Sequence, residues 1–169
     1  PAVLIPRQET ELLVEMAMGC FEASDAPQRW ADLGTGSGCL AVALARHWPS
    51  TSGWAVDCSR EALAVARRNA AALGLLQGAA VQWCEGLWWQ PLQPLAGQLA
   101  LVVSNPPYIP SAVAAPQMLA PGGWLVLEHH HDQAAAVDQL LGAAGLQERR
   151  QERDLEGQMR FAVARRSNP

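Results

Sequence analysis

Hydrophobic residues follow two different spacings along the chain. Between positions 9 and 21 they recur on one face of a helix, at Leu12, Leu13, Met16, Ala17 and Cys20. Elsewhere they form short runs bounded by turn residues, which is typical of strands. These runs predict strands at residues 29–33, 53–57, 79–84, 99–104, 124–128, 146–150 and 159–165.

Three more helices are predicted between these strands, at residues 39–47, 60–73 and 132–144. Ser59 is suited to cap the start of the second, and Gly74 to follow its end. The run at 99–104 is almost continuously apolar, as expected of a buried parallel strand. Alternating strands and helices predict an α/β fold with a doubly wound, mostly parallel sheet.

Length and composition define the class of protein. The chain has 169 residues, of which 50% are hydrophobic and 17% are charged, which is typical of one globular domain. Its net charge is −4, and all of its cationic residues are arginine. Because binding to nucleic acid relies on cationic contacts to phosphate, this balance argues against a nucleic-acid partner.

The four cysteines form no C-x-x-C pair, so neither a zinc ribbon nor a disulfide framework is predicted. No apolar run is long enough for a membrane span, and no signal peptide is recognisable. We therefore expect a cytoplasmic protein without a membrane partner.

A glycine-rich turn, Gly34-Thr35-Gly36-Ser37-Gly38, lies between the first predicted strand and its helix. Glycines let the backbone approach a ligand closely, and the helix start offers free N–H groups. The second strand then ends in Asp57, an acid able to accept hydrogen bonds from ribose hydroxyls. The structural alternatives are a simple turn and a helix cap. Together the two features favour a ligand that contains adenosine.

A second motif, Asn105-Pro106-Pro107-Tyr108, follows the buried strand at 99–104. Prolines donate no backbone hydrogen bond, so this turn presents carbonyl oxygens, and Asn105 adds a side-chain carbonyl. Adjacent acceptors can hold a planar –NH2 group with its lone pair aimed at an electrophile, and Tyr108 can pack on its plane. The structural alternative is a turn that only closes the strand.

These two motifs resemble those of class I S-adenosylmethionine-dependent methyltransferases that modify –NH2 nitrogens. The opening string Ile5-Pro6-Arg7-Gln8-Glu9-Thr10-Glu11 is similar to that of the HemK-type release factor glutamine methyltransferases. Further matches run through residues 55–59, 62–69, 121–124, Glu128, 154–157 and Arg160, so the resemblance covers nearly the whole chain. It implies a seven-stranded Rossmann-like sheet with a final antiparallel strand.

The resemblance also implies a role for each site residue. Methyl transfer from S-adenosylmethionine would yield N5-methylglutamine in the Gly-Gly-Gln loop of a peptide chain release factor, and S-adenosylhomocysteine. Cofactor contacts are expected from Gly34, Thr35, Gly36, Ser37, Gly38, Asp57, Trp88 and Asn105, with core packing as the alternative for Trp88. Glutamine would be held by Asn105, Pro106, Pro107 and Tyr108, with Thr10 and Glu11 closing the pocket. Catalysis, expected from Asn105, Pro106 and Tyr108, would rest on positioning and desolvation, since no strong base stands nearby.

Two other functions are compatible with these motifs. Enzymes that methylate the N6 of adenine or other amino groups of nucleic acids share the Asn-Pro-Pro-Tyr motif, because a base –NH2 poses the same chemical problem. A cofactor-binding module without activity is the other.

Three consecutive histidines, His129, His130 and His131, are poorly arranged for one metal ion, and no metal site is expected.

The chain is shorter than the resemblance to this family leads us to expect. Relatives have a longer segment, with a helix, between Tyr108 and Pro121. We expect residues to be missing near 111–117, and the family's N-terminal helical domain to precede Pro1. The region 1–169 would then be the methyltransferase catalytic domain.

Overall fold

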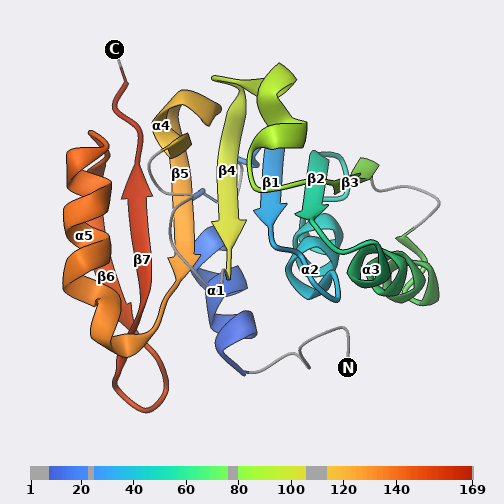
Figure 1. Cartoon of the computed structure of the whole chain (residues 1–169), viewed down its shortest axis with the longest axis horizontal. Helices are drawn as coiled ribbons and strands as arrows, with labels where there is room; N and C mark the ends of the chain where they lie inside the picture. The colour runs from blue at the N-terminus through green and yellow to red at the C-terminus, as the bar shows by residue number, and fades with distance from the viewer. Residues whose placement is uncertain (1–7, 23–24, 76–79, 106–113, 169) are drawn as a thin grey trace.

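A seven-stranded sheet forms the centre of the protein (Figure 1). The computed structural model describes residues 8–22, 25–75, 80–105 and 114–168. The strands follow the order β3-β2-β1-β4-β5-β7-β6. They are β1 (Arg29–Leu33), β2 (Ser52–Asp57), β3 (Ala80–Glu85), β4 (Leu99–Ser104), β5 (Leu119–Glu128), β6 (Gln147–Arg153) and β7 (Met159–Arg165).

Strands β1 to β5 run parallel to one another, and β7 runs antiparallel between β5 and β6. This confirms the predicted mostly parallel sheet with an antiparallel final strand. The helices are α1 (Gln8–Met18), α2 (Cys39–His47), α3 (Arg60–Ala72), α4 (Ala115–Met118) and α5 (Ala134–Ala143), with 3-10 turns η2 (Gln90–Leu95) and η4 (His131–Gln133).

Two hydrophobic clusters cover the two faces of the sheet. One combines β-strand side chains with Leu13 and Ala17 of α1 and the apolar face of α2. The other lies beneath η2, α4 and α5, and includes Leu92, Met118 and Val137. Helix α3 packs on α2, β2 and β3. Within the described ranges, no helix is long and apolar enough to cross a membrane.

Capping explains where α3 begins and ends. The Ser59 side chain accepts a hydrogen bond from the N–H of Ala62, at 3.2 Å, and Gly74 follows the helix with φ +74°. Both residues therefore act as the sequence predicted. Helix α1 is shorter than its prediction, since its pattern continues to Phe21 but the chain turns at Gly19.

The prediction for the start of β5 was wrong. The strand was predicted to begin at Trp124, but Pro121, Gly122 and Gly123 already lie within it. The strand continues because Gly122 N donates to Arg166 O, and Arg166 N donates to Gly123 O. The β4–β5 register shifts between Leu99 and Leu101, so these residues form a bulge, which the local sequence cannot distinguish from a turn.

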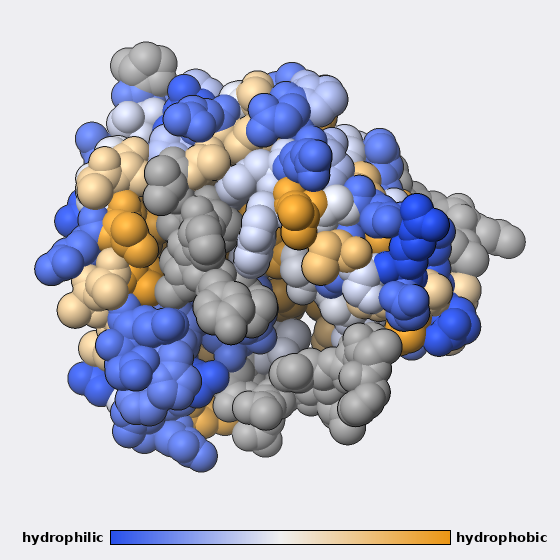
Figure 2. Space-filling view, viewed as in Figure 1, coloured by the Kyte–Doolittle hydropathy of each residue, from blue (hydrophilic) through white to orange (hydrophobic). Residues whose placement is uncertain are grey.

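At the far side, β6 is an edge strand rich in charged residues, and most of them are exposed. Its ladder to β7 shifts between Gln147 and Arg150, and Glu148 adopts φ +47° in this irregular stretch. Figure 2 shows mainly hydrophilic residues at the lower left, over the hairpin that joins β6 to β7. The sheet thus ends in a polar, irregular edge.

Close packing of Trp30 against β2 gives a test of this core. A Cβ at Gly53 would lie 2.2 Å from Trp30 Cζ2, and the Trp30 ring is fully buried, with its Nε1–H bonded to Thr51 Oγ1 at 2.9 Å. We expect Gly53→Ala to lower the free energy of unfolding by about 3 kcal/mol, measured by urea denaturation. Gly19→Ala is the control, because its Cβ would meet only ordinary contacts at 3.4 Å. Equal losses in the two variants would contradict this account.

Candidate functional site

The carboxyl ends of β1 and β4 meet where the strand order reverses. The chain leaves β1 toward β2 on one side and leaves β4 toward β5 on the other, so the loops after these strands diverge. Such a point is where open α/β sheets bind ligands. A buried hydrogen bond from Ser104 Oγ to Leu33 O, at 2.7 Å, ties the two strand ends together.

Hydrogen bonds to β2 and to Asp32 of β1 hold the start of the glycine-rich loop that follows β1. Gly34 N and Thr35 N both donate to Val56 O at 2.9 Å, and Thr35 Oγ1 donates to Asp32 Oδ2 at 2.6 Å. Gly34, Gly36 and Gly38 all have positive φ, between +55° and +79°. A side chain at these positions would be strained, which explains the repeated glycine.

The glycines also set how closely other parts approach. A Cβ at Gly38 would lie 2.8 Å from Ala66 Cβ, so the missing side chain lets α3 pack against the loop. At Gly34 a Cβ would meet nothing within 4 Å. Gly34 therefore faces open space, where a ligand can approach the backbone.

Asp57 connects this loop to the ends of β2 and β3. Its Oδ2 accepts a hydrogen bond from Gly36 N, and its Oδ1 accepts one from Ser59 N, both at 2.9 Å. Its backbone carbonyl accepts one from Gly86 N at 3.0 Å. Because Ser59 caps α3, Asp57 is not the helix cap. Each carboxylate oxygen keeps a further lone pair for a ligand hydroxyl.

A cavity of about 220 Å³ opens beside this carboxylate. Its lining residues are Gly34, Val56, Asp57, Cys58, Gly86, Leu87 and Trp88. The structure thus brings Asp57, Gly34 and Trp88 together, as expected, with an acid on one wall and an aromatic ring on another. Trp88 has φ +49°, which is unusual for a bulky residue and typical of functional sites.

Sequence reasoning missed four of the residues that line this cavity. Val56 and Cys58 flank Asp57, and Gly86 and Leu87 directly precede Trp88. Their position next to two expected contact residues was the available signal. None of the four adds a charged or aromatic side chain that would mark it as a nucleoside contact in the sequence.

Thr10 and Glu11 lie in the first turns of α1. Burial raises the pKa of the Cys39 thiol at the start of α2, and the negative charges of Asp32 and Glu11 raise it further. Glu11 is therefore within electrostatic reach of the helix that follows the glycine loop. Thr10 is half-buried, and its expected contact with substrate stays a prediction.

Asn105 is half-buried directly after β4, at the same edge. Pro106, Pro107 and Tyr108 lie outside the described residues, as do residues 111–113 of the segment 111–117. Their predicted roles therefore stay predictions. Asn105 itself stands on the β4 side of the reversal, and the cavity beside Asp57 lies on the β1–β2 side.

Asp32, beneath the loop, is fully buried. Burial raises its pKa from the ordinary 3.8 to about 7; the Asp57 charge raises it further, while hydrogen bonds from Thr35 and the Ala41 backbone lower it. Its Oδ1 has no hydrogen-bond partner. The acid below the glycine-rich loop therefore titrates near neutral pH.

The adjacent histidines His129 and His130 contact different partners. His129 is buried and contacts His130 O and Gln151 Oε1, each at 2.8 Å, whereas His130 pairs with Asp132 at 2.7 Å. Among the described residues, no three histidine, cysteine, aspartate or glutamate side chains gather as metal ligands.

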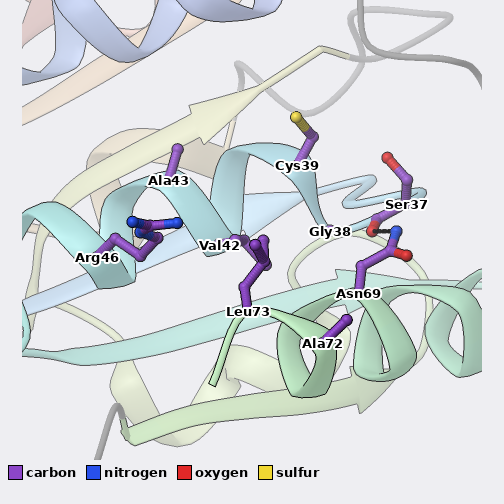
Figure 3. A pocket seen from close by; sticks show the side chains of 9 residues that line it. All are labelled: Ser37, Gly38, Cys39, Val42, Ala43, Arg46, Asn69, Ala72 and Leu73. Carbon is purple, nitrogen blue, oxygen red and sulfur yellow. Dashed lines mark hydrogen bonds between the residues drawn. The ribbon is translucent and has the colours of Figure 1, made fainter. Parts of the chain in front are cut away.

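A larger hollow of about 450 Å³ lies between α2 and α3 (Figure 3). Its walls are mostly apolar and include Val42, Ala72 and Leu73, while Asn69 Nδ2 donates to Ser37 O at 2.9 Å. Its lining residues include no carboxylate and no aromatic ring, whereas the smaller cavity has both. The smaller cavity is therefore the better nucleoside site.

Comparison with known proteins gives one consistent result. The family "Methyltransferase small domain" matches residues 8–152. The chain is 40% identical to a "Release factor glutamine methyltransferase" of Prochlorococcus marinus over 198 residues, which cover 98% of this chain and 67% of that protein. It is 42% identical to a protein of the same name from Xylella fastidiosa, covering 97% of this chain and 69% of the other.

The chain spans about two thirds of the length of these relatives. The aligned stretch of 198 residues is longer than the 169-residue chain, so the relative carries positions that have no counterpart here. In fold, the chain is similar to ribosomal protein L11 methylase from Lactobacillus delbrueckii subsp. bulgaricus. The TM-score is 0.80 at 22% identity, over 99% of this chain and 83% of the other.

The buried acid predicts how stability depends on pH. The native pKa of Asp32, about 7, lies above its ordinary value of 3.8, so the native state binds a proton that the unfolded chain releases. The free energy of unfolding should therefore fall as pH rises from 4 to 7, by on the order of 4 kcal/mol, and then level off. Urea denaturation across this range should show a flatter profile for Asp32→Asn. Asp138→Asn, at an exposed ion pair, is the control, and an unchanged slope in Asp32→Asn would refute the assignment.

Proposed function

Because the chain belongs to the release factor glutamine methyltransferases, we propose that it methylates the side-chain amide nitrogen of the glutamine in the Gly-Gly-Gln motif of a peptide chain release factor. We propose S-adenosylmethionine as the methyl donor, in keeping with the methyltransferase domain matched over residues 8–152. The observation that carries the proposal is the edge of the sheet where β1 and β4 meet. There a glycine loop and Asp57 lie on one side, and Asn105 lies on the other.

The cavity beside Asp57 fits the adenosine part of this cofactor. Asp57 would accept hydrogen bonds from the ribose hydroxyls, and Trp88 would lie against the adenine. Backbone exposed by Gly34, Gly36 and Gly38, with Thr35 and Ser37 between them, would hold the methionine part. When bound, S-adenosylmethionine supplies a methyl group already activated by its sulfonium.

The chain's own task is then to orient a poor nucleophile. An amide nitrogen shares its lone pair with the carbonyl, so it attacks only when held in line with the methyl group and shielded from water. We propose that the Asn105 side-chain carbonyl and the Pro106 backbone carbonyl accept the two N–H bonds of the substrate. Tyr108 would pack on the amide plane, Pro107 would stiffen the turn, and Thr10 and Glu11 would close the pocket.

The proposal extends to the chain's setting. A net charge of −4 favours a protein substrate over nucleic acid. A cytoplasmic location stays a prediction. Helix α4 has only 4 residues between β4 and β5, so we place some of the positions absent from this chain there, near 111–117.

The activity is tested by mass spectrometry. Unmethylated release factor, DNA and RNA are each incubated with the protein and S-adenosylmethionine, and we expect one added methyl on the Gly-Gly-Gln glutamine. Asn105→Ala should lower kcat/KM by about 100-fold, because the nitrogen loses its orientation. Methyl transfer only to nucleic acid would refute the proposed substrate, and no transfer to any of them would favour an inactive module.

Cofactor binding is tested separately by calorimetry. Asp57→Ala removes the acceptor proposed for ribose, and should weaken S-adenosylmethionine binding about 10- to 100-fold. Glu61→Gln is the matched control, since it removes an exposed carboxylate in the first turn of α3. Unaltered affinity in Asp57→Ala, with the fold intact by circular dichroism, would refute this ribose contact.

A further inference from the structure

One ion pair differs from all others in the described part of the chain. Arg160 Nη2 lies 3.0 Å from Glu128 Oε1, and the exposed fractions of the two side chains are 21% and 8%. In every other described ion pair both side chains are at least 35% exposed. Glu128 is thus a carboxylate that the fold buries together with its counterion.

The pair lies at the substrate side of the proposed site. Ser104 is aligned with Leu127 in the parallel ladder of β4 and β5. Asn105 and Glu128 are the residues that follow, so they stand together where these two strands end. Arg160 reaches Glu128 from β7, whose Phe161 is aligned with Glu128.

The surroundings keep this pair in place. His129 N donates to Arg160 O at 2.8 Å, and the His129 ring contacts Gln151 of β6. Hydrogen bonds of His129, the next residue, therefore tie the end of β5 to β7 through the backbone and to β6 through a side chain. Taking two charges out of water costs several kcal/mol per ion, and well-packed apolar residues often replace such a pair without loss of stability. Stability alone does not account for it.

We propose that Glu128, held by Arg160, is a positioning residue that places the carboxylate end of a buried ion pair beside Asn105. The inference rests on the proposed function. As the amide lone pair forms the new N–C bond, the electrons of the S–C bond return to sulfur and positive charge moves onto the nitrogen, which then releases a proton to water. A fixed carboxylate nearby favours that charge without having to reorganise.

The test is single-turnover methyl transfer to release factor at saturating S-adenosylmethionine. Glu128→Gln keeps the shape and removes the charge; it should slow transfer about tenfold or more, while cofactor affinity stays within about twofold. Glu128→Asp keeps the charge and should retain more of the rate. Glu148→Gln is the matched control, because Glu148 also pairs with an arginine of β7 at 3.0 Å but is exposed.

A wild-type rate in Glu128→Gln would overturn the inference, as would equal slowing in the Gln and Asp variants, which would indicate packing. If Glu128→Gln does not fold, the double variant Glu128→Gln/Arg160→Gln is used instead, because it leaves no buried charge unpaired. Slower methyl transfer in the double variant supports the inference, and a wild-type rate overturns it. Failure of the wild-type protein to methylate release factor would instead refute the proposed function, and this inference with it.

Discussion

The site depends on one carboxylate, that of Asp57. Its two oxygens bind the N–H groups of Gly36 and Ser59, and its carbonyl binds Gly86 N. One residue at the end of β2 therefore fixes the loops that follow β1, β2 and β3. The cavity lies among these loops, so its shape is set before any ligand arrives, which lowers the entropic cost of binding.

Much of the fold could be predicted from the sequence. The strands at 29–33, 99–104 and 159–165 and helix 39–47 have the predicted bounds, because their apolar runs end sharply at glycine, proline or polar residues. Pro121–Gly123 could not be predicted, since the bulge in β5 depends on pairing with β4 and β7. The site was predicted in part: Asp57 and the glycines have distinctive chemistry, whereas Cys58 and Leu87 line the cavity only because of tertiary structure.

The ionisation of Asp32 likewise depends on its burial in the folded protein, which the neighbouring residues in the sequence do not reveal. Near Gly34 the chain needs an acceptor for Thr35, and Asp32 provides it at the expense of burying a carboxyl group. Glu128 shows the other solution, an acid buried with its arginine. Both acids lie at or below the carboxyl edge of the sheet. This distribution fits the general tendency of proteins to place energetically unfavourable groups where they serve a ligand rather than where they serve the fold.

The position of β7 has a consequence for the order of folding. The ribosome makes β7 after β6, yet β7 lies between β5 and β6. Until it is synthesised, β5 presents an unpaired edge that carries Leu125, Val126 and Leu127, all buried in the finished protein. A nascent chain that ends before Met159 therefore exposes an unpaired apolar strand edge that can pair with other chains. Stalled or truncated copies of this protein should be substrates for chaperones and proteases rather than partly active enzymes.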